Sequence, residues 1–448
     1  MAKAKKKESL TPEERLQAAL VPESEQPYPV PANWCWTRIG DILRLQAGKN
    51  ISASKISKNR SQEASFPCFG GNGVRGYVER YNHDGEFPII GRQGALCGNV
   101  NWASGKFYAT EHAVVVECSS IISKRWAYRI LFSMNLNQYT TATAQPGLSV
   151  AVINQVPIAL PPAQEQQRIV DRIESLFAKL DEAKQKAQDA LDSFETRKAA
   201  ILHKAFTGEL TAQWRKKHSI GMESWETKKL SEVSTLQTGL MKGKNYSGKT
   251  VMLPYLRVAN VQDGFLNLSE IKEIEVSEEL IDRYSLKNGD VLFTEGGDYD
   301  KLGRGTVWQG QIKNCLHQNH VFVVRPQADV LSPYFLSYQA GSRYGKQYFL
   351  KCSKQTTNLA SINSTQLKGF PVLMPTIEEQ AQIVLLIDDL LAKEQQAREA
   401  AEGVLEQIDL MKKAILARAF RGELGTNNPS EESSVELLKT CYCGKLQS

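Results

Sequence analysis

Two long stretches of the chain carry apolar residues at steps of three or four, which is helical spacing. In the first stretch these positions include Ile169, Ile173, Leu176, Leu180 and Leu191, and in the second they include Ile383, Ile387, Leu390, Leu405 and Ile408. Each apolar stripe is narrow, and Glu, Lys, Gln and Asp fill the rest, as is typical of a coiled-coil seam. We therefore predict that the two helices pack against each other through these residues.

The two helical stretches are copies of one plan. Residues 157–210 match residues 371–424 without a gap, at a constant offset of 214. The first helix, predicted over 163–206, would be about 66 Å long at 1.5 Å per residue. Gly208 and Gly422 follow the two helices, where a residue free to adopt positive φ is favoured.

The segments ahead of the helices correspond only at their entry, where Trp34 and Gly48 align with Trp225 and Gly239. Beyond that entry the two copies diverge. Both contain short β-branched runs between Gly and Asn turns, at 87–90, 113–116, 290–294 and 321–324. The sequence thus predicts an α+β protein in which two similar helices, packed as an antiparallel coiled coil, carry two dissimilar β-rich heads.

Composition narrows the class of protein. With 448 residues, 42% hydrophobic and 23% charged, the chain can form several globular domains. No apolar run approaches the roughly 20 residues that a membrane span needs, and the scattered cysteines suit reduced thiols, so we expect a cytoplasmic protein. The net charge of +6 favours polyanion binding only weakly. Both polar ends are expected to be mobile, apart from a short helix capped by Thr11 and Glu14.

Two motifs suggest chemistry but have simpler interpretations. Residues 243–250 fit the phosphate-loop pattern GxxxxGK[ST], yet a helix start is blocked by Pro254 and no buried strand is expected before them. Cys315, His317 and His320 lack a fourth zinc ligand nearby, and we interpret them as polar residues entering a strand. Neither an adenine-methyltransferase motif nor a glycine-rich cofactor loop is found. An ATP-using enzyme is therefore the weakest hypothesis.

The paired motifs together resemble the specificity subunit of type I restriction-modification enzymes. The resemblance is carried by Pro157–Pro162 leading to Glu165-Gln166, by Pro371–Pro375 leading to Glu379-Gln380, and by the paired Ala-Phe-x-Gly-Glu-Leu helix ends. It covers nearly the whole chain and implies a basic arm (1–30), a first target-recognition domain (31–156), a first helical region (157–214), a second recognition domain (215–370), a second helical region (371–424) and a polar tail (425–448).

The resemblance further implies a non-catalytic subunit that binds double-stranded DNA, two methyltransferase subunits and two restriction/translocase subunits. S-adenosylmethionine, ATP and magnesium would then be bound by those partners and not by this chain. Two alternatives stay open: a subunit serving a methyltransferase without a nuclease, and a coiled-coil adaptor that does not read DNA.

Side chains with paired donors and acceptors read bases, and Lys or Arg on phosphates hold the register. In the first head the candidates are Asn72, Arg75, Arg92 and Gln93. In the second head they are Lys242, Lys244, Asn245, Tyr246, Lys249, Arg257, Asn260, Lys301, Arg304 and Gln318. We predict that each head reads one half of a split target and that the paired helices set the gap between the halves.

Overall fold

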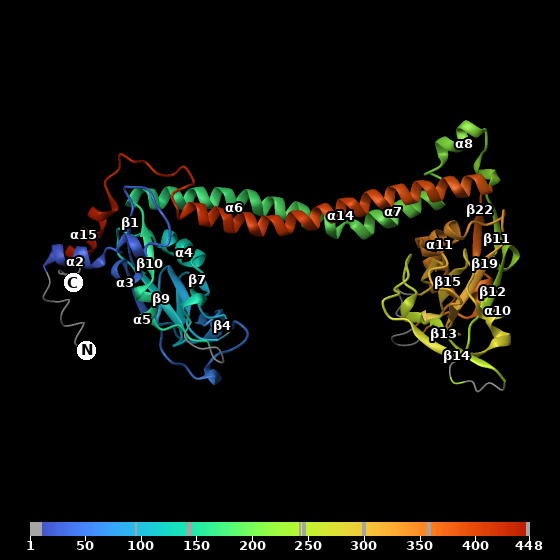
Figure 1. The fold of residues 1–448 in the computed structure, drawn as a ribbon, viewed down its shortest axis with the longest axis horizontal. Helices are drawn as coiled ribbons and strands as arrows, with labels where there is room; N and C mark the ends of the chain where they lie inside the picture. Colours follow the sequence, from blue (N-terminus) through green and yellow to red (C-terminus); the bar gives the residue numbers. More distant parts are fainter. Residues whose placement is uncertain are drawn as a thin grey trace. The chain divides into compact units, whose positions relative to one another are not determined.

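The chain forms two compact units in the computed structural model, which describes residues 11–94, 96–140, 146–241, 243, 248–297, 302–355 and 360–444. Unit 1 consists of Met1–Ala187 with Gly403–Ser448, and unit 2 is Gln188–Glu402. Each unit contains one β-rich head and parts of the long helices (Figure 1). Within the described residues, no helix is both long and apolar enough to cross a membrane.

Head 1, the part of unit 1 from Cys35 to Leu160, is built on two four-stranded sheets. The central sheet has the order β2-β9-β6-β7, with β2 (Leu43–Ala47), β9 (Ala113–Cys118), β6 (Phe87–Gly91) and β7 (Val100–Ala103) all antiparallel. The second has the order β4-β3-β8-β5, with β4 (Gly73–Val78), β3 (Phe66–Gly70), β8 (Lys106–Ala109) and β5 (His83–Asp84). The runs predicted at 87–90 and 113–116 are therefore confirmed as strands, and Ala113–Val116 is fully buried.

Head 2, the part of unit 2 from Glu226 to Met374, repeats this topology. Its central sheet has the order β12-β19-β15-β17, with β12 (Ser234–Thr238), β19 (Val321–Pro326), β15 (Val291–Thr294) and β17 (Gly305–Val307) again antiparallel. Two three-stranded sheets accompany it: β14-β13-β18, formed by Lys272–Ser277, Thr250–Leu256 and Leu316–His317, and β16-β21-β20, formed by Gly296–Gly297, Ala360–Ser361 and Lys354–Gln355.

The two heads thus differ in sequence but share the topology of their central sheets. The strand order of the central sheet is the same, and one parallel pair recurs in the second sheet, β3 with β8 and β13 with β18. A core tolerates extensive apolar exchange when volume and patterning are kept, so sequence identity can vanish while the strand order persists.

A two-stranded ladder joins the entry of each head to its exit. In head 1 it pairs β1 (Cys35–Arg38) with β10 (Pro157–Leu160), and in head 2 it pairs β11 (Glu226–Lys229) with β22 (Pro371–Met374). Short helices complete head 1, namely α3 (Ile39–Ile42), α4 (Lys124–Ser133) and α5 (Val150–Gln155). Those of unit 2 outside the long helices are α8 (Ala212–His218), α9 (Leu230–Val233), α10 (Ile281–Tyr284), α11 (Pro333–Gly341), α12 (Arg343–Cys352) and α13 (Ser364–Lys368).

The long helices are α6 (Ala163–Asp192), α7 (Phe194–Phe206) and α14 (Ile377–Ala419). The single helix predicted over 163–206 is therefore interrupted, at Ser193. There the Ser193 hydroxyl and the Arg197 guanidinium both donate to the carbonyl of Ala190, at 3.0 and 3.2 Å, and such local side-chain bonds compete with the helical ladder. Both helix ends are confirmed, with φ of 76° at Gly208 and 75° at Gly422.

Antiparallel packing of these helices is visible inside each unit. In unit 1, Lys412 bonds Asp181, and Lys184 lies 3.9 Å from Asp409. Residue numbers therefore rise along one helix as they fall along the other, which means that the helices are antiparallel. In unit 2, Arg197 bonds Glu394 at 2.6 Å, and the Arg398 guanidinium lies 5.3 Å from the centre of the Phe194 ring, so these helices also run in opposite directions.

The predicted seam residues divide by burial. Ile169, Ile173, Ile383, Ile387 and Ile408 are buried, and Leu176, Leu180, Leu191, Leu390 and Leu405 are half-buried. Ile169 and Ile173 share one core with strand residues of head 1 as well as with Leu416 and Ala419 of α14, so the ends of the helices belong to the heads.

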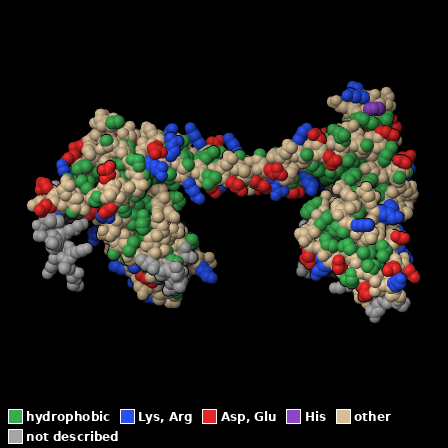
Figure 2. Space-filling view, viewed as in Figure 1, with side chains coloured by type: hydrophobic (Ala, Val, Ile, Leu, Met, Phe, Trp, Pro, Cys, Tyr) green, Lys and Arg blue, Asp and Glu red, His purple; other side chains and the backbone are tan. Residues whose placement is uncertain are grey.

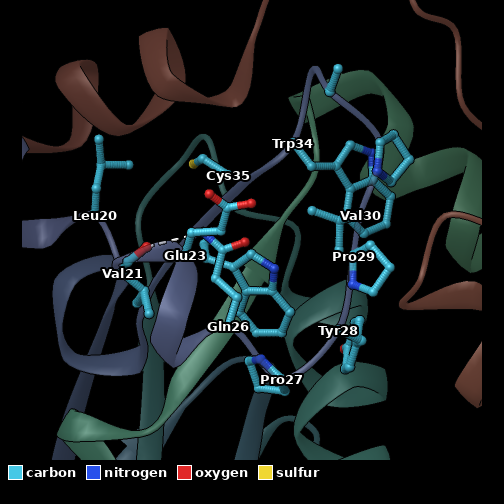
Figure 3. A pocket seen from close by; sticks show the side chains of 13 residues that line it. Leu20, Val21, Glu23, Gln26, Pro27, Tyr28, Pro29, Val30, Trp34 and Cys35 are labelled. Atoms are coloured by element: carbon cyan, nitrogen blue, oxygen red, sulfur yellow. Dashed lines mark hydrogen bonds between the residues drawn. The ribbon is translucent and has the colours of Figure 1, made fainter.

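The described parts of both chain ends are packed against head 1, contrary to the expected mobility. The capping box of Thr11 and Glu14 is confirmed at the start of α2 (Pro12–Ala19). Leu16 of α2 and Leu438 of α15 (Ser434–Gly444) lie in the core of unit 1. The Pro-rich segment that follows α2 lines a hollow of about 720 Å³, where Gln26 donates to the Val21 carbonyl at 3.1 Å (Figure 3). Apolar side chains and this hydrogen bond within the segment hold it in position before β1 begins.

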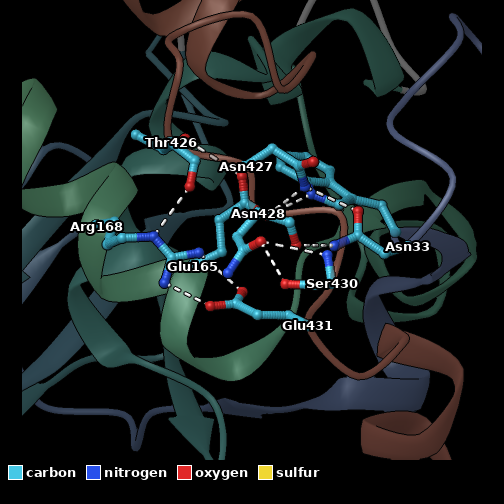
Figure 4. Close-up of polar contacts among 9 residues, drawn as sticks. Asn33, Glu165, Arg168, Thr426, Asn427, Asn428, Ser430 and Glu431 are labelled. Atoms are coloured by element: carbon cyan, nitrogen blue, oxygen red, sulfur yellow. Dashed lines mark hydrogen bonds and ion pairs between the residues drawn. The ribbon is translucent and has the colours of Figure 1, made fainter.

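A buried Glu-Gln pair stands at the start of α6. Glu165 is 0% exposed and accepts hydrogen bonds from Trp34 Nε1 at 2.7 Å, from Asn427 Nδ2 at 2.9 Å and from Thr426 Oγ1 at 3.2 Å (Figure 4). Gln166 accepts from the Ser123 amide at 2.8 Å. The motif therefore ties the helix to the residue before β1, to the loop before α4 and to the C-terminal tail.

The tail makes a second attachment one turn further along α6. Arg168 forms two hydrogen bonds with Glu431, at 2.7 and 2.8 Å, and donates from Nε to the Thr426 carbonyl at 2.9 Å (Figure 4). The bond to Glu431 raises the pKa of Arg168. Side-chain pairing that is distant in sequence thus holds a segment whose composition alone predicts mobility.

The equivalent pair at the start of α14 meets different partners. Glu379 is 0% exposed and accepts from Trp225 Nε1 at 3.0 Å, from Thr211 Oγ1 at 2.7 Å and from Arg215 Nη1 at 2.5 Å. Gln380 accepts from the Ser332 amide at 2.9 Å, as Gln166 does from Ser123. In both units the carboxylate is therefore completed by a segment that follows a long helix.

Candidate nucleic-acid interface

Three of the four candidates of head 1 lie on adjoining loops, and the fourth lies in the strand that follows one of them. Asn72 is in the turn between β3 and β4, Arg75 is in β4, and Arg92 and Gln93 directly follow β6. These loops approach closely because two positions have no side chain. A Cβ on Gly71 would lie 2.5 Å from the Gln93 carbonyl oxygen, and one on Gly91 would lie 1.8 Å from the Gly71 carbonyl oxygen. Asn72, Arg75 and Gln93 are exposed and Arg92 is half-buried.

The structure adds polar residues at this place that the sequence analysis missed. His112 Nε2 lies 3.2 Å from Glu111 Oε1, and the Arg92 amide donates to the His112 carbonyl at 3.0 Å. Asn99 donates to Asn72 at 2.9 Å. Within the described chain, four buried side-chain atoms here have no hydrogen-bond partner: Arg92 Nε, Asn101 Nδ2, Glu111 Oε2 and His112 Nδ1. Such atoms are rarely left unsatisfied in native proteins, so ordered water or a polar ligand is expected to complete their hydrogen bonds.

This cluster lies at the end of head 1 that faces away from α6. Strand β9 runs from Ala113, beside His112, to Cys118, and the chain then reaches Ser123, whose amide bonds Gln166 of α6. A strand of this length spans about 20 Å. We call this end, formed by residues 71–75, 91–93, 99–101 and 110–112, the outer end of head 1.

In head 2 some candidates gather at the corresponding end. Arg304 donates to Gln262 at 2.8 Å, and its carbonyl accepts from the amide of Thr294 at the end of β15. Gln318 follows β18 and donates from its amide to the Leu256 carbonyl at 2.9 Å. Arg257 follows Leu256 and is half-buried, and its Nη2 lies 3.4 Å from Glu270 Oε1.

Other candidates of head 2 do not join this group. Asn260 is 2% exposed, and its side chain is used by the backbone of Arg257, Asn267 and Glu270, so it holds its own loop together. Its burial gives no support to a DNA contact. Lys249 is exposed just before β13. The remaining candidates lie outside the described residues: Lys242, Lys244, Asn245, Tyr246 and Lys301.

The motifs that suggested phosphate or metal binding have structural roles where they are described. Thr250, the last residue of the phosphate-loop pattern, begins strand β13 and not a helix. His317 is buried in β18, bonds the Val321 carbonyl at 2.8 Å and has its pKa lowered to about 4 by burial. Burial also raises the pKa of the Cys315 thiol to about 12. No group of three potential metal ligands occurs among the residues that the structure describes.

Backbone pairing at the ends of β6 and β15 relates two positions in the two heads. The Glu295 amide donates to the His320 carbonyl at 3.0 Å, as that of Arg92 does to His112. The Ile362 amide donates to the Glu295 carbonyl at 2.7 Å, as that of Leu148 does to Arg92 at 2.9 Å. Arg92 therefore corresponds to Glu295, and His112 corresponds to His320.

Basic side chains also gather outside the heads. The last turn of α8 contains Arg215, Lys216, Lys217 and His218, and Figure 2 shows this group over α8. Arg215 is the buried partner of Glu379, whereas Lys216, Lys217 and His218 are exposed. None of these four residues was among the candidates predicted from the sequence.

Comparisons with known proteins agree with this arrangement. A family model described as a type I restriction modification DNA specificity domain matches residues 31–191 and 222–402. The chain is 47% identical over 141 residues to the EcoprrI specificity subunit of Escherichia coli, which is 31% of this chain and 35% of that protein. It is 30% identical over 282 residues to the EcoKI specificity subunit of Escherichia coli K12, covering 61% of this chain and 59% of that one. These matches thus span less than two thirds of either relative.

Solved structures show the same fold. The HsdS subunit from Thermoanaerobacter tengcongensis aligns with a TM-score of 0.56 and 17% identity, over 89% of this chain and 100% of that one. A chain from a structure of a type I R-M system aligns with a TM-score of 0.58 and 18% identity over the same shares.

Proposed function

Because the chain belongs to the type I restriction-modification DNA specificity family, we propose that it recognises a two-part DNA target, with one half read by each head. The observation that carries this proposal is the recurrence of one topology with a polar outer end in both heads. Two similar scaffolds with different side chains at the same positions suit two different half-sites. We also propose that the domain boundaries are those of the recognition and helical regions inferred from the sequence.

We propose that the long helices set the distance between the half-sites. Helix α14 alone is 43 residues, about 65 Å at 1.5 Å per residue. Its ion pairs with the first helical region, such as Arg197 with Glu394, support a stiff connection. The target would then contain a nonspecific gap of fixed length.

The chain itself would be non-catalytic. Two methyltransferase subunits would dock on the two helical regions, and two restriction/translocase subunits would join them, with S-adenosylmethionine, ATP and magnesium bound by those partners. The repeat supports this stoichiometry because it offers each partner two equivalent surfaces. A subunit serving only a methyltransferase is the second candidate, and copurifying chains distinguish the two.

Genome-wide methylation mapping tests the proposal, in cells that contain the partner methyltransferase with and without this gene. We expect a two-part motif with a fixed gap that disappears when the gene is deleted. A continuous motif, or methylation that does not depend on the gene, contradicts the two-headed reading. Failure of both heads to bind any DNA in the purified complex favours the adaptor alternative.

A further inference from the structure

One position at the outer end of the central sheet carries opposite charges in the two heads. Arg92 directly follows β6 in head 1, and Glu295 directly follows β15 in head 2. Each is held by the same two backbone hydrogen bonds, one donated to a histidine carbonyl and one accepted from the strand or loop before the exit of the head. The backbone therefore presents two different side chains from one fixed place.

The Arg92 side chain is half-buried at the outer end of head 1. Its Nε has no hydrogen-bond partner within the described residues, although the atom is buried. Polar neighbours flank it, since Gln93 is exposed beside it and the turn of Asn72 packs against the same loop. The Glu111–His112 pair is a further polar neighbour, because the His112 carbonyl accepts a hydrogen bond from the Arg92 amide.

Glu295 is presented at the surface of head 2 in a comparable way. Its side chain is 34% exposed and accepts a hydrogen bond from His320, which fixes its orientation. It lines a hollow of about 470 Å³ together with Asn319, His320 and Asn363. The carboxylate therefore has two asparagines and a histidine among its neighbours. It lies at the end of head 2 opposite to Ser332, which bonds Gln380 at the start of α14.

We propose that Arg92 and Glu295 are base-reading residues at one equivalent position, and that Arg92 selects guanine while Glu295 selects cytosine. This inference rests on the proposed function, because it assigns one base pair in each half of the two-part target. Arginine donates two parallel hydrogen bonds to O6 and N7 of guanine, and a carboxylate accepts from the N4 amino group of cytosine. Each half-site accordingly contains a G·C pair at this position. Head 1 contacts the guanine of its pair, and head 2 contacts the cytosine of its pair.

The test compares Arg92→Gln and Glu295→Gln in the full complex with its methyltransferase, by methylation mapping in cells. For Arg92→Gln we expect preference for the parental guanine to fall by roughly 5- to 150-fold in one half of the motif, with the other half and the gap unchanged. For Glu295→Gln we expect the same loss at a G·C pair in the other half. Because the untouched half reports on folding and assembly, a local loss of preference is not a loss of structure.

Matched controls remove the same charges elsewhere in the heads. Arg44→Gln changes an exposed residue of β2, and Glu226→Gln changes an exposed residue of β11. Both should leave the motif as it is. Binding of the purified complexes to duplexes with the parental pair and with that pair inverted gives a second readout, in which only the Arg92 and Glu295 variants should lose discrimination.

Three outcomes overturn the inference. A motif unchanged by Arg92→Gln and Glu295→Gln means that neither residue reads a base. Weaker binding that is uniform over all sequences means that Arg92 contacts phosphate. If the parental chain itself produces no gene-dependent two-part motif, the proposed function fails as well, and this result is distinct from the first two.

Discussion

The first turns of α6 and α14 occupy equivalent places in the repeat, but the buried carboxylates that they contain have different hydrogen-bond partners. Glu165 in unit 1 and Glu379 in unit 2 are both 0% exposed, and both accept from a tryptophan indole. In unit 2 the remaining partners include the Arg215 guanidinium, whose side chain is only 7% exposed. In unit 1 the remaining partners are a neutral hydroxyl and a neutral amide, from Thr426 and Asn427.

This difference shows that one motif can be satisfied by charge neutralisation or by neutral donors alone. A buried ion costs free energy unless hydrogen bonds or an opposite charge replace water. The cation of unit 1 is one turn away, where Arg168 pairs with Glu431 near the surface. We therefore expect unit 2 to be more sensitive than unit 1 to any change that leaves one member of its pair uncompensated.

The largest expected effect comes from neutralising each carboxylate. Glu379→Gln leaves Arg215 buried without its counter-ion, and we expect it to lower the free energy of unfolding of unit 2 by about 3–5 kcal/mol. Glu165→Gln removes only hydrogen bonds to neutral donors, and we expect a loss of about 1–3 kcal/mol in unit 1. Hydrogen exchange under increasing denaturant, followed separately for peptides of the two units, measures both.

The neighbouring Glu378 is exposed, so Glu378→Gln is the control and should change neither unit measurably. Equal losses for Glu165→Gln and Glu379→Gln would mean that the Arg215 pair contributes no more than the neutral donors do.

A second contrast concerns acid sensitivity. His317 of head 2 corresponds to Ala109 of head 1, because each residue ends the short strand that pairs in parallel with β13 or β3. Burial lowers the pKa of His317 from its ordinary value of 6.5 to about 4. Above pH 6.5 the residue is neutral in both the folded and the unfolded chain, and stability is unaffected.

As the pH falls from 6.5 towards 4, the unfolded chain binds a proton that the folded chain does not, so unit 2 should lose up to about 3 kcal/mol. Unit 1 has no titrating group at this position. Urea unfolding between pH 7 and 4, read by unit-specific exchange, checks this, and His317→Ala should flatten the decline. His203→Gln, which changes an exposed histidine of α7, should not.

Features that rest on local periodicity could be predicted from the sequence. The helices, the strands near Ile89 and Val115, and the positive φ of Gly208 each depend on neighbours within a few residues. The break at Ser193 could not, since it arises from competition of two side chains for one carbonyl. Nor could the attachment of the tail to Glu165, which joins residues 261 and 262 positions apart.

Part of the candidate interface could also be predicted, because it depends on residues that are close together in the sequence. Arg92, Gln93 and Asn72 were candidates because their side chains carry hydrogen-bond donors or acceptors suited to bases, and they lie together on adjoining loops. The correspondence of Arg92 with Glu295 was hidden, because the loops between the strands of the two heads differ in length. Only strand register reveals which residues share a position.

The smallest contrast concerns the hydroxyl that serves each carboxylate. Thr211 is 1% exposed, donates to Glu379 at 2.7 Å and accepts from Arg215 at 2.9 Å, whereas Thr426 is half-buried and donates to Glu165 at 3.2 Å. Thr211→Val should therefore cost unit 2 about 1–3 kcal/mol, because it leaves charged groups one partner short. Thr426→Val should cost unit 1 no more than about 1 kcal/mol, because Trp34 and Asn427 still donate to the same carboxylate and water can reach the vacated side. Unit-resolved denaturant midpoints measure both, and a larger loss for Thr426→Val than for Thr211→Val would show that the tail attachment depends on this hydroxyl and not on the Arg168–Glu431 pair.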